Sequence, residues 1–343
     1  MKALNLTAYN TFKLDEFPEP QIGPNEVLVQ VKACGICGSD VHGMDGSTGR
    51  RKPPIIMGHE AAGVIARAGS AVRNWKPGHR VTFDSTVYCG TCAFCRQGLV
   101  NLCDSRRVLG VSCDDYRCNG AFAEFVAVPE HILYRLPDNL PFEQAALVEA
   151  LSVAVHAVNR TPHAIGDTAV VVGAGMIGQL IIQVLRVSGC SRIVAIDLER
   201  EKLEMARRFG AEICLKADEG DPVAEVLKLT GGRGADIAFE AVGVTPTIRT
   251  AIQVLRKSGS LTLVGNLSPQ IDLQLQAVVT RELTLRGTCA SCGEYPACLD
   301  LIAQGKVDVK PLISAVAPLE EGASWFKRLH AKEKGLIKVV LTV

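Results

Sequence analysis

Four cysteines with regular spacing offer the clearest chemistry in the sequence. They lie in the segment YCGTCAFCRQGLVNLC and are Cys89, Cys92, Cys95 and Cys103. Four thiolates on a short loop can surround a zinc ion tetrahedrally at about 2.3 Å from each sulfur, and a shell closed by four protein ligands is typical of a structural site. Iron–sulfur ligation has similar spacing and stays an alternative. Disulfides conflict with the reducing compartment that we expect for this chain.

A second set of residues could form an open metal site. Cys37 lies in CGICGSDVH, and His59 and Glu60 lie in MGHEAAGV. One thiolate, one imidazole and one carboxylate leave a fourth position for water or substrate, as catalytic zinc sites do. The sequence does not show that positions 37 and 59 meet in space. Two other interpretations stay open: a buried or surface histidine with no ligand role, and a redox pair formed by Cys34 and Cys37.

The segment GAGMIG, residues 173–178, predicts a dinucleotide-binding turn. It follows an apolar strand at 168–172 and opens a helix, so its glycines allow a tight turn, close approach of a pyrophosphate and close packing of helix on strand. Asp197 ends the next predicted strand, where a carboxylate accepts hydrogen bonds from the adenosine ribose and repels a 2′-phosphate. NAD is therefore favoured over NADP, although Arg200 and Lys202 lie nearby. The expected cofactor-binding residues are Gly173, Gly175, Met176, Ile177, Gly178, Asp197, Arg200, Lys202, Val242, Val264 and Gly265.

The elements that must position these groups change in character along the chain. Up to about residue 148, short β-branched runs between glycines and prolines predict an irregular β-rich domain. Beyond it, strands and helices alternate, which predicts a parallel, doubly wound sheet of the Rossmann type. The strands are expected at 169–173, 192–197, 213–215, 235–241, 260–265 and 283–287, and the helices at 177–188, 200–209, 223–229 and 247–256. The tail from residue 293 is expected to pack back on the first domain.

Composition excludes several classes of function. The chain has 343 residues, enough for two domains, and its net charge is +1. A nearly neutral chain is a poor candidate for binding nucleic acid or a membrane surface. The apolar stretch 168–187 contains Gln179, Gln183 and Arg186, which favours a buried strand, turn and helix over a membrane span. The first residues show no secretory signal, and we expect a soluble, cytoplasmic protein.

Several unrelated motifs in one order resemble a known family. They are CGICGSDVH, GHEAAGVIARAGSAV, the four-cysteine segment, GAFAE at residues 120–124, the glycine fingerprint and Asp197. Across essentially the whole chain this pattern resembles the zinc-containing alcohol dehydrogenases of the medium-chain dehydrogenase/reductase superfamily. The resemblance implies a GroES-like catalytic domain, residues 1–148 completed by 288–343, and a Rossmann NAD-binding domain at 149–287. It also implies a homo-oligomer, a dimer or tetramer, formed through the Rossmann domain.

Within that family, Glu149 in LVEALSVAVHA resembles the polyol dehydrogenase branch. The resemblance implies that Cys37, His59, Glu60 and a water surround a catalytic zinc, and that Glu60 and Glu149 exchange at the metal. Two departures are visible: Ala150 stands where the branch usually has proline, and the stretch 287–292 lacks the aromatic–arginine pair of sorbitol dehydrogenases.

Ser39 and His42 resemble the proton relay of the family. By residue type alone, Ser39 and Asp40 could equally cap a helix. The basic run Arg50, Arg51 and Lys52 is expected to be a solvated loop, with a contact to a phosphorylated substrate as a minority alternative.

Together these features predict an NAD-dependent dehydrogenase with two zinc ions per chain that oxidises a secondary alcohol of a polyol to a ketone. The alternatives are a vicinal-diol dehydrogenase, an L-threonine 3-dehydrogenase, a polyol-phosphate dehydrogenase and, more distantly, a non-catalytic NAD- or zinc-binding protein. The pair Cys289 and Cys292 is not explained by any of them.

Overall fold

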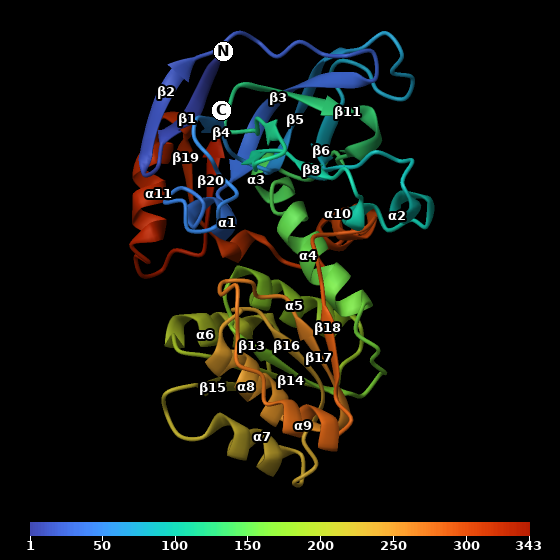
Figure 1. Ribbon diagram of the computed structural model, residues 1–343, viewed down its shortest axis with the longest axis vertical. Coiled ribbons are helices and arrows are strands. Elements are labelled where there is room, and N and C mark those ends of the chain that lie inside the picture. The colour runs from blue at the N-terminus through green and yellow to red at the C-terminus, as the bar shows by residue number, and fades with distance from the viewer. The chain divides into compact units, whose positions relative to one another are not determined.

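The chain leaves its first structural unit after residue 149 and returns to it near its end. In the computed structural model, which describes residues 1–343, the first unit comprises residues 1–149, 291–305 and 309–343 (Figure 1). The second unit comprises residues 150–290 and 306–308.

A seven-stranded sheet forms the centre of the first unit. Its order is β12-β6-β5-β3-β20-β19, and β11 also pairs with β3. The last strands of the chain therefore complete a sheet begun by the first ones. The strands of this unit are β1 Lys2–Ala8, β2 Thr11–Glu16, β3 Glu26–Gly35, β4 Ile55–Ile56, β5 Glu60–Ala68, β6 Arg80–Phe83, β7 Thr86–Val87, β8 Arg107–Val108, β9 Val111–Ser112, β10 Arg117–Cys118, β11 Phe125–Pro129, β12 Leu133–Arg135, β19 Ile313–Pro318 and β20 Lys338–Thr342.

Short helices connect these strands. Most hold fewer than two turns, as expected for a region dense in glycine and proline. They are α1 Gly38–Val41, α2 Ala93–Arg96, η1 Val100–Leu102, η2 Glu130–Ile132, α3 Phe142–Ala145, α10 Tyr295–Ala303, η3 Lys310–Leu312, η4 Leu319–Glu321 and α11 Gly322–His330. Helix α11 belongs to the core because Phe326 is fully buried and lies edge-on against Phe122, with ring centroids 5.6 Å apart.

The second unit is a six-stranded parallel sheet, and this fold class is confirmed. Its strand order, β15-β14-β13-β16-β17-β18, is that of a doubly wound dinucleotide-binding sheet. All five residues of β13 are buried, as parallel strands covered on both faces require. The elements are α4 Val148–Asn159 (shared with the first unit), β13 Thr168–Val172, α5 Met176–Val187, β14 Arg192–Asp197, α6 Arg200–Phe209, β15 Ile213–Lys216, α7 Pro222–Leu229, β16 Ala235–Glu240, α8 Thr245–Gln253, β17 Leu255–Leu263, α9 Leu275–Thr280 and β18 Thr284–Gly287.

One boundary in this unit was predicted wrongly. The helix expected to run to residue 256 ends at Gln253, and β17 already begins at Leu255 rather than at residue 260. The cause is an irregularity in the ladder: Ala235 pairs with Leu255, but Ile237 pairs with Ser260. The residues between Leu255 and Ser260 are therefore extra relative to β16, and Ser258 among them has φ of 57°.

The apolar stretch 168–187 forms β13, a turn and α5, as expected. None of the chain's helices combines the length and the apolar character needed to cross a membrane. None of the thirteen cysteines forms a disulfide bond.

The turn between β13 and α5 leaves no room for a side chain at Gly178. A Cβ atom there would overlap the carbonyl oxygen of Gly173, whereas one at Gly287 would meet open space. We expect Gly178→Ala to lower the free energy of unfolding by about 1–3 kcal/mol, the usual range for overpacking. Gly287→Ala is the matched control and should stay within about 0.5 kcal/mol of the parent. Denaturant unfolding measures both, and equal stabilities would contradict this account of the turn.

Candidate functional site

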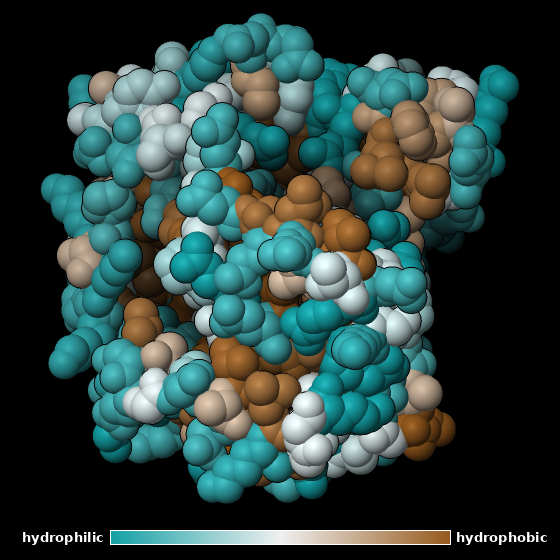
Figure 2. Space-filling model, turned by 60° about the horizontal axis from the view of Figure 1, so that its bottom comes forward, coloured by the Kyte–Doolittle hydropathy of each residue, from teal (hydrophilic) through white to brown (hydrophobic).

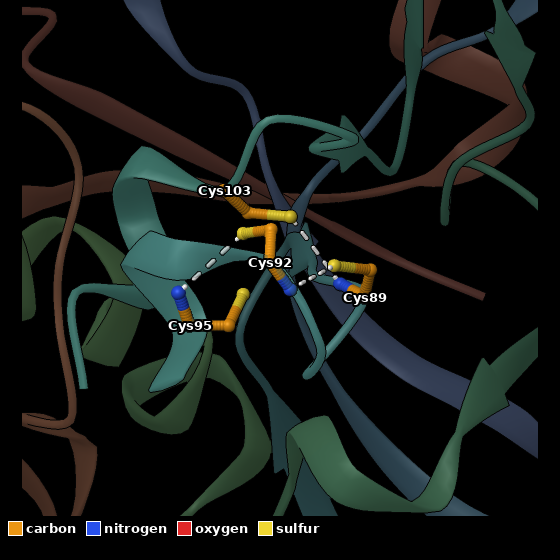
Figure 3. A group of neighbouring side chains, drawn as sticks. All are labelled: Cys89, Cys92, Cys95 and Cys103. Atoms are coloured by element: carbon orange, nitrogen blue, oxygen red, sulfur yellow. Dashed lines mark hydrogen bonds between the residues drawn. The ribbon is translucent and has the colours of Figure 1, made fainter. Parts of the chain in front are cut away.

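The four cysteines of the closed group lie around one point. They come from the loop between β7 and β8, which contains α2 and η1, and their sulfur atoms all lie within 4.8 Å of one another (Figure 3). A zinc ion bonded tetrahedrally to four sulfurs at 2.3 Å would space them about 3.8 Å apart, so the group fits this metal. The residues concerned are Cys89, Cys92, Cys95 and Cys103.

Hydrogen bonds from backbone amides and the closeness of the four sulfurs favour the binding of a cation. The amides of Cys89 and Cys92 donate to Cys103 Sγ and Cys89 Sγ, each at 3.3 Å. Hydrogen bonds from Thr91 and from the Cys92 amide lower the pKa of Cys89 to about 6. Desolvation and hydrogen bonding to Cys92 raise the pKa of Cys95 to about 12. These neighbouring thiols cannot all lose their protons together, because their negative charges would repel one another. A bound divalent cation would stabilise them as thiolates.

The open group is assembled by the pairing of β3 with β5. Gly35 in β3 is paired with Glu60 at the start of β5. This register brings Cys37, just beyond β3, to His59 and Glu60, and the ligand atoms of these three residues lie within 4.8 Å of one another. A side chain at Gly35 would overlap Oε2 of Glu60, so it would displace this carboxylate. Cys34 is fully buried in the core of the first unit, which does not favour a redox pair with Cys37.

Asp40 faces the imidazole of the group. Its Oδ1 atom lies 3.4 Å from His59 Nδ1, and both side chains are buried. A carboxylate on one ring nitrogen is the usual partner of a metal-bound histidine, because it leaves the other nitrogen free for the metal. Asp40 lies inside α1 and does not cap it, because the N-cap residue of this helix is Cys37.

Arg51 binds the same oxygen of Asp40 that faces His59, which corrects the prediction of a solvated basic loop. Its side chain is only 4% exposed, and its Nη2 atom donates to Asp40 Oδ1 at 2.8 Å. Burial alone would raise the pKa of Asp40, but His59 and Arg51 outweigh it and hold the pKa well below its usual range. The neighbouring Arg50 is exposed, as predicted.

A second buried ion pair holds Glu60. Lys338 Nζ in β20 donates to Glu60 Oε1 and Oε2 at 2.8 and 2.6 Å and to the Ile36 carbonyl at 3.0 Å. Burial lowers the pKa of Lys338, but the charges of Glu60 and Cys37 outweigh it and raise the pKa. Lys338 was not among the site residues predicted from the sequence. Its one signal is a lysine at the start of a strand that is otherwise apolar.

Glu149 lies close to the open group without joining it. It stands in the first turn of α4 and is not among the residues whose ligand atoms lie within 4.8 Å of one another. Burial, together with the negative charges of Glu60 and Asp84, raises its pKa to about 7, although the charge of His59 opposes this shift. Ser39 and His42 both belong to α1 or its end, and Ser39 Oγ accepts a hydrogen bond from Arg51 Nη2 at 3.3 Å.

In the second unit, the predicted cofactor residues gather at the carboxyl edge of the sheet. Gly173 has φ of 94°, and Gly265 lies so close to Val242 and Gly243 that a Cβ atom would overlap their backbone. Asp197 Oδ2 accepts a hydrogen bond from the amide of Ala174, inside the glycine turn, at 2.7 Å. Val264 follows β17 at the same edge, and Met176 and Ile177 begin α5.

The two cations near Asp197 are already paired with carboxylates. Arg200 Nη2 donates to both oxygens of Glu219 at 2.8 Å, and Lys202 Nζ donates to Glu199 Oε1 at 2.7 Å. Their charge is therefore partly neutralised where a 2′-phosphate would need it.

Comparison with known proteins finds relatives for both units. Residues 23–138 match the model of the alcohol dehydrogenase GroES-like domain, and residues 177–304 match that of the zinc-binding dehydrogenases. The chain is 35% identical over 335 residues to D-xylulose reductase A of Aspergillus oryzae, covering 95% of this chain and 92% of that protein. It is 33% identical over 345 residues to sorbitol dehydrogenase of Bacillus subtilis, covering 99% and 97%.

Solved structures show the same architecture. The 2R,3R-butanediol dehydrogenase of Bacillus subtilis superposes with a TM-score of 0.90 at 32% identity, over 100% of this chain and 99% of that one. A zinc-binding dehydrogenase of Sinorhizobium meliloti 1021, solved with NADP, superposes with a TM-score of 0.92 at 29% identity, over 100% and 99%.

The match extends over both units and over nearly the full length of the relatives, and it agrees with the open ligand group and the glycine turn described above. The chain therefore belongs to the zinc-containing alcohol dehydrogenase family and is an oxidoreductase that acts on a CH–OH group with zinc and a nicotinamide cofactor.

Proposed function

We propose that this enzyme oxidises a secondary alcohol of a polyol to a ketone and transfers the hydride to NAD. The observation that carries the proposal is the open group of Cys37, His59 and Glu60 with a further buried carboxylate, Glu149, beside it. Relatives named D-xylulose reductase and sorbitol dehydrogenase, which the chain matches over more than nine-tenths of its length, support a substrate with several hydroxyl groups.

Each residue of the site has a distinct proposed role. Cys37 and His59 would hold the zinc, and Glu60, kept in place by Lys338, would complete the group or exchange with Glu149. Zinc supplies a Lewis acid for the substrate oxygen, and the nicotinamide accepts the hydride. Ser39 and His42 would pass the alcohol proton toward solvent by general acid–base transfer.

The metal content follows from the two ligand sets. The closed group of four cysteines would bind a structural zinc, because it leaves no position for a substrate. The open group would bind the catalytic zinc. We therefore propose two zinc ions per chain.

NAD is the proposed cofactor, held by Asp197 and the glycine turn. A carboxylate facing the ribose accepts hydrogen bonds from its hydroxyls and repels a 2′-phosphate. The pairing of Arg200 and Lys202 with Glu219 and Glu199 supports the same preference. One structural relative binds NADP, so the preference is a property of these side chains and not of the fold.

A vicinal diol is the second candidate substrate, and the structural likeness to a butanediol dehydrogenase favours it. The structure gives less support to a polyol phosphate at the basic run, because Arg51 is buried and bound to Asp40. L-threonine 3-dehydrogenase activity rests only on the resemblance.

Assembly and location are further proposals. Strand β18 is an edge strand of the second sheet, and Leu275 and Val279 on the preceding helix are 63% and 64% exposed. Figure 2 shows apolar patches on the face that it presents. Exposed apolar patches of this kind mark interaction sites, which supports a dimer or tetramer through this unit. Thirteen cysteines without a disulfide bond support a reducing compartment such as the cytoplasm. We also propose domain limits at 1–148 with 288–343, and at 149–287, which the two compact units support.

The two ligand sets predict different consequences of losing a cysteine. Cys37→Ser should abolish turnover and remove one zinc while the thermal unfolding midpoint changes little. Cys92→Ser should lower the midpoint first, because it opens the closed group. Metal analysis of the purified chain, with melting curves of both variants, checks this. Full activity in a metal-free chain would contradict the proposed mechanism.

Asp197 is predicted to set cofactor preference. Asp197→Ser should narrow the ratio of kcat/KM for NAD to that for NADP, by tenfold for each 1.4 kcal/mol or so of discrimination lost. Steady-state kinetics with both cofactors measure it, and Glu201→Gln, a neighbouring acidic residue on α6, is the control. A parent enzyme that uses both cofactors equally would show that Asp197 does not have this role.

The carboxylates of the site predict poor activity on simple alcohols. A site that bonds several hydroxyls discriminates strongly against an analogue without them, because its buried polar groups are left unpaired. We expect kcat/KM for ethanol to lie far below that for sorbitol, xylitol or 2,3-butanediol. A panel of ethanol, diols, C4–C6 polyols and their phosphates tests the proposal, and highest efficiency on ethanol would overturn it.

A further inference from the structure

Arg51 has an environment unlike that of the residues around it. It follows the exposed Arg50 in a basic run, yet its guanidinium is buried. The backbone on either side is fastened to β9, where Ser112 donates its amide to the Arg50 carbonyl at 3.3 Å and its hydroxyl to the Lys52 carbonyl at 2.8 Å. The loop is thus fixed where it delivers one side chain inward.

The guanidinium makes a directed set of contacts. Arg51 Nε and Nη2 donate to Asp40 Oδ1 at 3.1 and 2.8 Å, and Nη2 also donates to Ser39 Oγ at 3.3 Å. Its Nη1 donates to the Arg50 carbonyl at 3.1 Å. Gly43 makes room for it, because a side chain there would overlap the aliphatic part of Arg51.

Asp40 depends on this partner. Its side chain is fully buried, its Oδ2 atom has no hydrogen-bond partner, and its other neighbour, His59 Nδ1, lies 3.4 Å from Oδ1. Removing one member of a buried ion pair is strongly unfavourable, because it leaves an uncompensated charge. Without Arg51, the carboxylate would have to move toward water or toward another donor, and His59 would lose the group that faces its Nδ1 atom.

We propose that Arg51 is a positioning residue for the catalytic metal, because it fixes Asp40 and thereby orients His59. By donating to Ser39 Oγ, it also directs the hydroxyl hydrogen of Ser39 away from the Arg51 guanidinium. The inference rests on the proposed role of His59 as a zinc ligand. Partners of metal ligands commonly contribute about 10- to 100-fold to metal affinity or activity.

The test compares two neighbouring arginines in the full-length, zinc-loaded enzyme. Arg51→Met should weaken binding of one zinc by about 10- to 100-fold, measured by competition with a chromophoric chelator. The other zinc, in the closed group, should be unaffected. Arg50→Met removes the same charge one residue away and should bind both zinc ions as the parent does. The zinc lost from Cys37→Ser identifies which of the two belongs to the open group. If Cys37→Ser retains both zinc ions, the proposed catalytic site itself is wrong, whatever Arg51 does.

A double-mutant cycle separates positioning from general stability. In an Asp40→Asn background, Arg51→Met should change zinc affinity by less than about twofold, because its route to His59 has already been cut. A purely structural role would lower the unfolding midpoint and leave the zinc affinity of the open site equal to that of Arg50→Met. That result, or an equal effect of Arg51→Met in both backgrounds, would overturn the proposal.

Arg51→Lys covers the case in which Arg51→Met does not fold. One ammonium group keeps the charge but cannot bond Asp40 through two nitrogens and reach Ser39 as well. It should weaken zinc binding less than Arg51→Met would, yet more than Arg50→Met does. Equality with Arg50→Met would again overturn the proposal.

Discussion

Two buried ion pairs stabilise the arrangement of the open ligand group. Asp40 and Glu60 are carboxylates in the interior of the first unit, and neither could stay there charged without a partner. Arg51 neutralises the first and Lys338 neutralises the second. Because both carboxylates lie beside Cys37 and His59, the charge balance of the site is set by side chains that need not touch the substrate.

The sheet of the first unit explains why these charges meet. Strand β3 pairs with β5 on one side and with β20 on the other. Glu60 begins β5, and Lys338 begins β20, so both lie at the same end of β3. The return of the chain to its first unit is therefore required by the site, since it delivers the cation that holds Glu60. In the second unit, Asp197 is fixed to the glycine turn through the amide of Ala174, and we propose that this turn and this carboxylate bind the cofactor.

Local sequence was sufficient for the parts of the protein that are built from neighbouring residues. The glycine turn and the strand ending at Asp197 lie within 25 residues, and their periodicity and spacing predicted the observed elements. The resemblance to the family gave the order of the two folds, which the comparisons confirm. The early start of β17, at Leu255, could not be predicted because an irregular ladder leaves no period to recognise.

Long-range partners could not be predicted in this way. Lys338 lies 278 residues from Glu60, and no spacing rule connects them. Arg51 lies only 11 residues from Asp40, but a run of three basic residues indicates solvent exposure unless the fold is known. The spacing of Cys37 and His59 alone did not show that they meet; the resemblance implied it, and the pairing of Gly35 with Glu60 accounts for it.

The central claim is that the open group holds a catalytic zinc through Cys37 and His59. An anomalous-difference map at the zinc edge, from crystals of the enzyme grown with zinc and NAD, tests it most directly. The account predicts two peaks per chain, one among the four cysteines and one bonded to Cys37 Sγ and His59 Nε2, with Asp40 facing His59 Nδ1. A single peak confined to the four cysteines, or a metal bonded to His59 through Nδ1, would contradict it.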